Sequence, residues 1–156
     1  MTQNAAPAAP RILALDPGSV RVGVAVSDEL GLYAHPRAAL AGKNRAEAAR
    51  QVAALVEGLD ISEVIVGLPL TLSGERGAQA EAARAFAQAI RSVLSVPVRE
   101  VDERLSSAQA GRLVPGDEAR LARAKPGKAG KRDGSLDSAA AAVLLQSVLD
   151  ARRGAR

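Results

Sequence analysis

The chain has 156 residues, 47% of them hydrophobic, with no cysteine and a net charge of +4. This length favours one domain whose core needs no disulfide, and the lack of cysteine excludes disulfides and thiolate metal sites. Residues 1–10 are rich in Ala and Pro and uncharged, unlike a signal peptide, and no apolar run approaches the ~20 residues of a membrane span. We therefore expect a cytoplasmic protein with a disordered tail over 1–10, a single domain over 11–151 and a C-terminal tail over 152–156.

The domain begins with a pattern of three strands. Apolar runs over 11–16 and 20–28 flank a turn at Pro17 and Gly18, so these two strands should pair antiparallel. A third strand is expected over about 31–37, which continues the antiparallel meander.

Helical and extended patterns alternate through the rest of the domain. A helix is expected from an N-cap at Asn44 to about residue 58, followed by a buried, β-branched strand over 63–68. A helix over about 78–94 and a strand over 97–102 come next, and the final helix is expected over about 137–151. An antiparallel meander followed by two crossover units predicts an α/β fold with a mixed five-stranded sheet and helices on both faces.

A basic segment lies between the fifth strand and the last helix. After a short helix to about Leu113, residues 115–135 are rich in Pro, Gly and Lys without periodicity, which predicts a mobile loop. The window 112–132 alone carries a net charge of +5, so the rest of the chain sums to −1. Such a concentration of cations is typical of an edge that binds polyanions, although a merely solvated loop would have the same composition. Because the chain has one Tyr and one Phe, backbone and shape contacts must carry most of any nucleic-acid binding.

Three acids stand at the ends of predicted elements: Asp16 closes the first strand, Glu103 follows the fifth, and Asp137 begins the last helix. Taken singly, each has a structural explanation: Asp16 as a turn residue, Glu103 as a solvated charge and Asp137 as an N-cap. Together they suggest a divalent-metal site, because carboxylates are ligands that Mg²⁺ or Mn²⁺ prefers. With one His and no Cys, the chain lacks the residues that nucleophilic catalysis would need. Asp102 and Glu103 should point to opposite faces of the strand, so only one of them is expected to reach this site.

Four sequence blocks, taken in order, resemble the YqgF/RuvX family of bacterial nucleases. They are the strand–Asp-x-Gly–strand opening with Gly-Val-Ala-Val-Ser-Asp at 23–28, Val-Ile-Val-Gly-Leu-Pro-Leu at 64–70, Asp-Glu-Arg-Leu-Ser-Ser at 102–107, and Leu-Asp-Ser-Ala-Ala-Ala at 136–141. The resemblance implies the RNase H-like fold of the Holliday junction resolvase RuvC, with strand order 3-2-1-4-5. It also implies that Asp16, Glu103 and Asp137 are catalytic acids that bind metal, with two Mg²⁺ or Mn²⁺ ions as the expected cofactor.

The hypothesis that follows is a divalent-metal-dependent nuclease that hydrolyses phosphodiester bonds and processes the 5′ end of the 16S ribosomal RNA precursor. A Holliday junction resolvase-like DNA endonuclease, which would need a homodimer, is the alternative, and a non-catalytic nucleic-acid-binding module is a remote one. The partner is therefore structured RNA or branched DNA and no membrane, with the chain a monomer or a homodimer. We expect phosphate contacts from six cations: Arg21, Arg104, Lys125, Lys128, Lys131 and Arg132.

Two departures from the family pattern affect the expected substrate preference. Val20 stands where members often carry Lys, next to Arg21, and Asp133-Gly134-Ser135 places an acidic step before Asp137, where a basic run is more usual.

Overall fold

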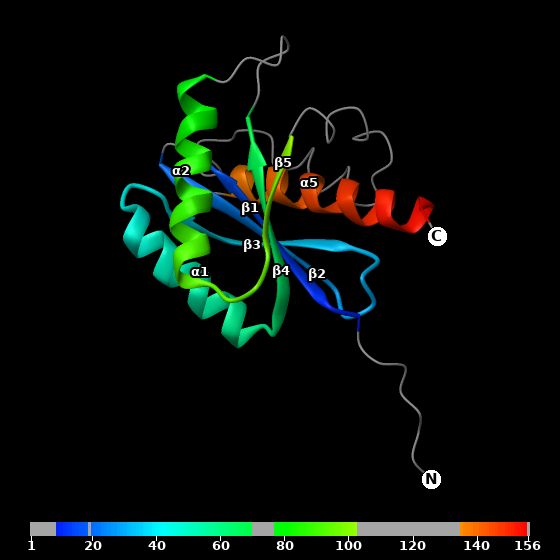
Figure 1. Cartoon of the computed structure of the whole chain (residues 1–156). Coiled ribbons are helices and arrows are strands. Elements are labelled where there is room, and N and C mark those ends of the chain that lie inside the picture. The colour runs from blue at the N-terminus through cyan, green and yellow to red at the C-terminus, as the bar shows by residue number, and fades with distance from the viewer. Residues whose placement is uncertain (1–8, 19, 70–76, 103–134, 156) are drawn as a thin grey trace.

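The computed structural model describes residues 9–18, 20–69, 77–102 and 135–155 (Figure 1). In this part of the chain the strands are β1 (Arg11–Pro17), β2 (Arg21–Ser27), β3 (Ala34–Ala41), β4 (Ile61–Leu68) and β5 (Val98–Asp102). The helices are α1 (Arg45–Gly58), α2 (Ala78–Val93) and α5 (Ser135–Gly154). None of these described helices is long and apolar enough to cross a bilayer.

The five strands form one sheet in the order β3-β2-β1-β4-β5. β1, β2 and β3 pair antiparallel as a meander, and β4 lies parallel to both β1 and β5. Helices α1 and α2 cover one face of the sheet and α5 covers the other (Figure 1). The predicted mixed sheet of order 3-2-1-4-5 with helices on both faces is therefore confirmed.

The alternation of side chains along β1 explains its continuous apolar sequence, because both faces of this central strand are buried. Leu13 and Leu15 pack into the core beneath α1 and α2, whereas Ile12 and Ala14 pack beneath α5. Asp16 follows Ala14 by two residues, so the alternation assigns it to the α5 face at the carboxyl end of β1.

β3 begins three residues later than the expected strand over 31–37, because a tight turn uses the preceding residues. The Asp28 carboxylate accepts a hydrogen bond from the Leu32 N–H at 2.8 Å, and Gly31 supplies a positive φ of 68°. The strand then runs through Pro36, which the pattern had placed near its end. Pro36 is tolerated there because β3 is an edge strand of the sheet.

α5 is longer at both ends than the helix expected over 137–151. It extends to Gly154, so residues 152–154, which were expected in a C-terminal tail, are helical. Arg152 donates two hydrogen bonds to the Glu63 carboxylate on β4, at 2.8 and 2.9 Å, and these bonds hold the last turn against the sheet. The expected short helix ending near Leu113 lies outside the described residues. The same is true of the predicted mobile loop 115–135, except for Ser135, which begins α5.

Candidate active site

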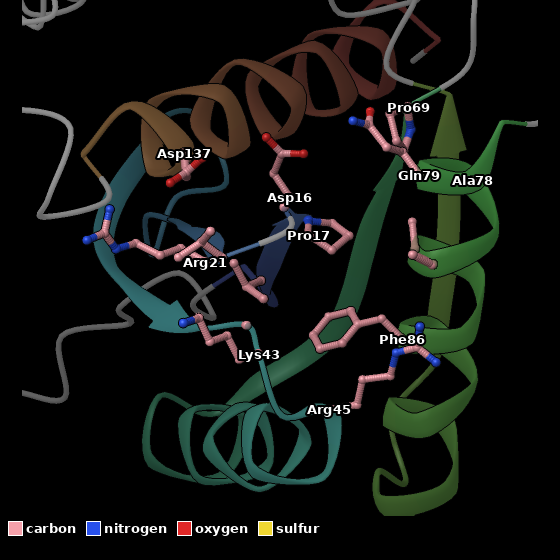
Figure 2. A pocket seen from close by; sticks show the side chains of 16 residues that line it. Asp16, Pro17, Arg21, Lys43, Arg45, Pro69, Ala78, Gln79, Phe86 and Asp137 are labelled. Atoms are coloured by element: carbon pink, nitrogen blue, oxygen red, sulfur yellow. The ribbon is translucent and has the colours of Figure 1, made fainter.

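The carboxylates of Asp16 and Asp137 meet at the carboxyl end of β1. Asp16 reaches this place from the sheet, and Asp137 reaches it from the first turn of α5, which packs across the same face. Figure 2 shows both side chains directed into the space beside the start of α5. Two of the three predicted acids, separated by 120 residues of sequence, are thus neighbours in the structure.

Close packing between β2 and the start of α5 positions Asp137. Gly23 pairs with Asp16 across the β1–β2 ladder, and a Cβ atom on Gly23 would lie only 1.9 Å from the Asp137 carbonyl oxygen. At the next residue, the Val24 N–H donates a 3.2 Å hydrogen bond to the buried Oγ of Ser138. The helix therefore rests directly on the β2 backbone, and glycine is required where the two backbones touch.

The electrostatics of the site show that the two acids repel each other. Burial raises the pKa of Asp137 above its usual value, and the nearby Asp16 charge raises this pKa further. Arg21 acts in the opposite direction and lowers the pKa of Asp137. Arg21 lies on the same face of β2 as Gly23 and Ala25, so it enters the site beside the two carboxylates.

These acids stand at one side of an open cleft of about 800 Å³. One wall is the uncharged face of α2 that carries Ala78, Gln79 and Ala82, and Phe86 lies deeper in the cleft (Figure 2). Two further cations line it: Lys43, which lies between β3 and α1, and Arg45, the first residue of α1. The cleft thus combines a carboxylate pair, cations and an uncharged wall, which suits a phosphate-bearing ligand with apolar surface.

The structure assembles part of the predicted site within the described residues. Asp16, Asp137 and Arg21 line one cleft, but the described residues hold no group of three or more His, Cys, Asp or Glu that could bind a metal. The other predicted site residues, Glu103, Arg104, Lys125, Lys128, Lys131 and Arg132, lie outside the described residues.

Asp102, the alternative to Glu103, ends β5 opposite Leu68 of β4. By strand alternation it shares a face with Val98, which packs against the core beneath α1 and α2. This face is opposite to the one on which Asp16 and Asp137 meet, which argues against Asp102 as their partner.

Sequence reasoning missed Lys43 and Arg45. Their position at the cleft follows only from the pairing of strands. β3 ends beside the start of β2, where Ala41 pairs with Arg21. Two cations on either side of a helix cap look like ordinary solvated charge until that pairing places them at the cleft.

Comparisons with known proteins identify relatives of this chain. The family model described as "RuvX: Holliday junction resolvase" matches residues 10–151. A protein of Thermobifida fusca named "Putative pre-16S rRNA nuclease" is 46% identical, over 90% of this chain and 87% of its own. Proteins of the same name from Chloroflexus aurantiacus and Mycobacterium leprae are each 42% identical, covering 91% and 99% of this chain and 88% and 80% of their own.

The similarity to solved structures concerns the fold. The structure titled "T. thermophilus RuvC in complex with Holliday junction substrate" has a TM-score of 0.59 at 17% identity, covering 94% of this chain and 97% of that one. A second Thermus thermophilus RuvC structure has a TM-score of 0.53 at 19% identity, with coverage of 92% and 96%. These matches show the RNase H-like fold.

Proposed function

Because the chain belongs to the RuvX family, we propose that it is a cytoplasmic, metal-dependent nuclease that processes the 5′ end of the 16S ribosomal RNA precursor. The observation that supports this best is the pair of carboxylates, Asp16 and Asp137, brought together on facing elements beside Arg21. The 16S precursor is proposed as the substrate because relatives that are 42–46% identical over most of the chain are named for it, and action at its 5′ end is part of the proposal.

The chemistry of the donors fits a hard divalent cation. The Asp16 charge raises the pKa of Asp137, so a cation between the two carboxylates would favour their ionised forms. Carboxylate oxygens are also the ligands that suit Mg²⁺ or Mn²⁺. When bound, such ions supply an activated water and stabilise the charge that develops on the phosphate. Asp16 and Asp137 would hold them, with Glu103 as the proposed third ligand. Glu103 is proposed from the resemblance of the Asp-Glu-Arg-Leu-Ser-Ser block to the family, and strand alternation assigns its neighbour Asp102 to the opposite face of the sheet.

The chain's own groups have separate roles in this proposal. Asp16 is held by the central strand of the sheet, and Asp137 is held by the packing of α5 on Gly23. Neither carboxylate therefore has to become ordered when the substrate binds. Arg21 lies beside them and contributes a guanidinium that can hold a phosphate group through two parallel N–H···O hydrogen bonds. We propose the same phosphate-binding role for Arg104, Lys125, Lys128, Lys131 and Arg132.

The family description favours a second candidate, a DNA endonuclease that resolves Holliday junctions. A four-way junction presents two symmetric strands, so this activity would require a homodimer with two copies of the site. Symmetric nicks in a junction, made by a dimer, would identify it.

The decisive experiment is a cleavage assay with an RNA that carries the 5′ flank of the 16S precursor and a four-way DNA junction, offered side by side. Each substrate is incubated with Mg²⁺, with Mn²⁺ and with EDTA, using the intact chain and an Asp16→Asn variant. We expect metal-dependent cutting of the RNA by the intact chain, loss of cutting by at least 100-fold in the variant, and retained folding and binding. Undiminished cleavage by Asp16→Asn, or equal cleavage in EDTA, would refute the proposed metal site.

A further inference from the structure

Lys43 and Arg45 lie across the cleft from the paired acids. Both are exposed and line the same cleft as Asp16 and Asp137, on the side formed by the end of β3 and the start of α1. In Figure 2 the Lys43 side chain lies below the two acids and Arg21, and the Arg45 side chain extends toward α2 at the level of Phe86. Three cations, Arg21, Lys43 and Arg45, therefore line the cleft that holds the acids.

The two cations are not used to stabilise the described part of the fold. Neither side chain forms a hydrogen bond or an ion pair with any described residue, whereas six described arginines are paired with acids: Arg11, Arg50, Arg91, Arg99, Arg152 and Arg153. Glu47, the acid nearest to them along the chain, is engaged instead by Arg50 and Gln51. Arg45 is also the first residue of α1, where the helix dipole disfavours a positive charge.

The backbone that carries these cations is fixed to the strand that carries Arg21. The Gly42 N–H donates a 2.8 Å hydrogen bond to the Val20 carbonyl oxygen, and a Cβ atom on Gly42 would lie 3.2 Å from the Arg21 backbone nitrogen. The backbone next to Lys43 is thereby held against the start of β2 before any ligand binds.

We propose that Lys43 and Arg45 bind a backbone phosphate of the nucleic-acid strand, adjacent to the phosphate that is cut. The nucleoside between the two phosphates then lies against the uncharged face of α2 formed by Ala78, Gln79 and Ala82. This inference rests on the proposed nuclease function and adds a second phosphate position to it. Because the contact is to the phosphodiester backbone, it is independent of base sequence.

The test measures binding of a fluorescent single-stranded RNA, and of a DNA of the same sequence, to the intact chain in EDTA across a series of salt concentrations. The double variant Lys43→Ala/Arg45→Ala is compared with Arg37→Ala/Arg153→Ala, which removes two exposed cations away from the cleft. A third variant, Lys43→Arg/Arg45→Lys, keeps both charges. Cleavage in Mg²⁺ or Mn²⁺ is measured in parallel, with thermal unfolding as the control for folding.

We expect the cleft variant to bind roughly tenfold more weakly, as loss of charge-assisted hydrogen bonds predicts. The slope of log affinity against log salt should fall by about 0.7, as for one phosphate on a single strand. The control variant and the charge-preserving variant should stay close to the intact chain, and the cleft variant should unfold at an unchanged or higher temperature. RNA and DNA should respond alike if the backbone alone is recognised.

Two different failures can be told apart. If the intact chain binds and cuts while the cleft variant matches it in affinity and salt slope, or if the control variant loses as much, the second phosphate position is refuted. If the intact chain neither binds nor cuts nucleic acid under any metal, both this position and the proposed function are refuted.

Discussion

Replacing Gly23 by Ala tests how the packing of α5 on β2 holds the candidate site together. The added Cβ would lie 1.9 Å from the Asp137 carbonyl oxygen, 2.2 Å from its carbonyl carbon and 2.9 Å from the Ser138 nitrogen. All three atoms belong to the backbone, so no side-chain rotation can relieve the contact. The first turn of α5 must move away from the sheet, and the Asp137 carboxylate must move with it.

The size of the effect follows from this geometry. The Cβ and the carbonyl oxygen must separate by about 1.5 Å to reach ordinary van der Waals contact at 3.4 Å. Overpacking of this kind costs about 1–3 kcal/mol in the free energy of unfolding, which corresponds to roughly 2–12 °C in the melting temperature of a chain of this length. A displacement of about 1 Å at a catalytic group is expected to lower kcat by about 100-fold.

The assay combines thermal unfolding with the metal-dependent cleavage described above. Gly58→Ala is the matched control, because a Cβ there meets nothing within 4 Å and the residue ends α1. The control should keep full activity and unfold at an unchanged or slightly higher temperature. If Gly23→Ala matched the intact chain in both stability and cleavage, the close contact between β2 and α5 would not be what positions Asp137.

Two further predictions concern Asp137, which is partly buried, and Gln146, which is buried. Asp137→Asn should abolish cleavage and raise the free energy of unfolding near neutral pH in EDTA. Burial and the Asp16 charge raise the pKa of Asp137 in the folded state, so the ionised carboxylate destabilises the native state at any pH above that pKa. The native state regains this stability as the pH falls through the raised pKa towards 3.8. Melting temperatures measured from pH 7 down to pH 4 should show this gain in the intact chain and less of it in the variant, and identical profiles would contradict it. Gln146→Leu should cost about 1–3 kcal/mol in urea unfolding, because the buried amide accepts from the Ala34 N–H at 2.9 Å and donates to the Leu32 carbonyl at 3.0 Å. A Ser92→Ala control on the exposed end of α2 should cost little, and an equal loss in both variants would argue against this account.

The sheet and its helices could be predicted from sequence because their signals are local. The turn at Pro17 and Gly18 fixes antiparallel pairing of its two flanking strands, and the apolar periods of α1, α2 and α5 follow from near neighbours in the chain. The expected ends were less accurate. α5 continues to Gly154 because Arg152 meets Glu63, a partner 89 residues away that no local pattern contains.

The identities of the acids were also present in the sequence, as carboxylates at the ends of elements, but their arrangement was not. Strand order and alternation place Asp16 and Asp137 on the α5 face and Asp102 on the other, and Gly23 brings the helix close enough for the two carboxylates to interact. The same tertiary pairing of β2 with β3 puts Lys43 and Arg45 at the cleft. Residue type and local period determine which elements form and which chemistry they carry, whereas contacts between distant segments decide which of those groups share one site.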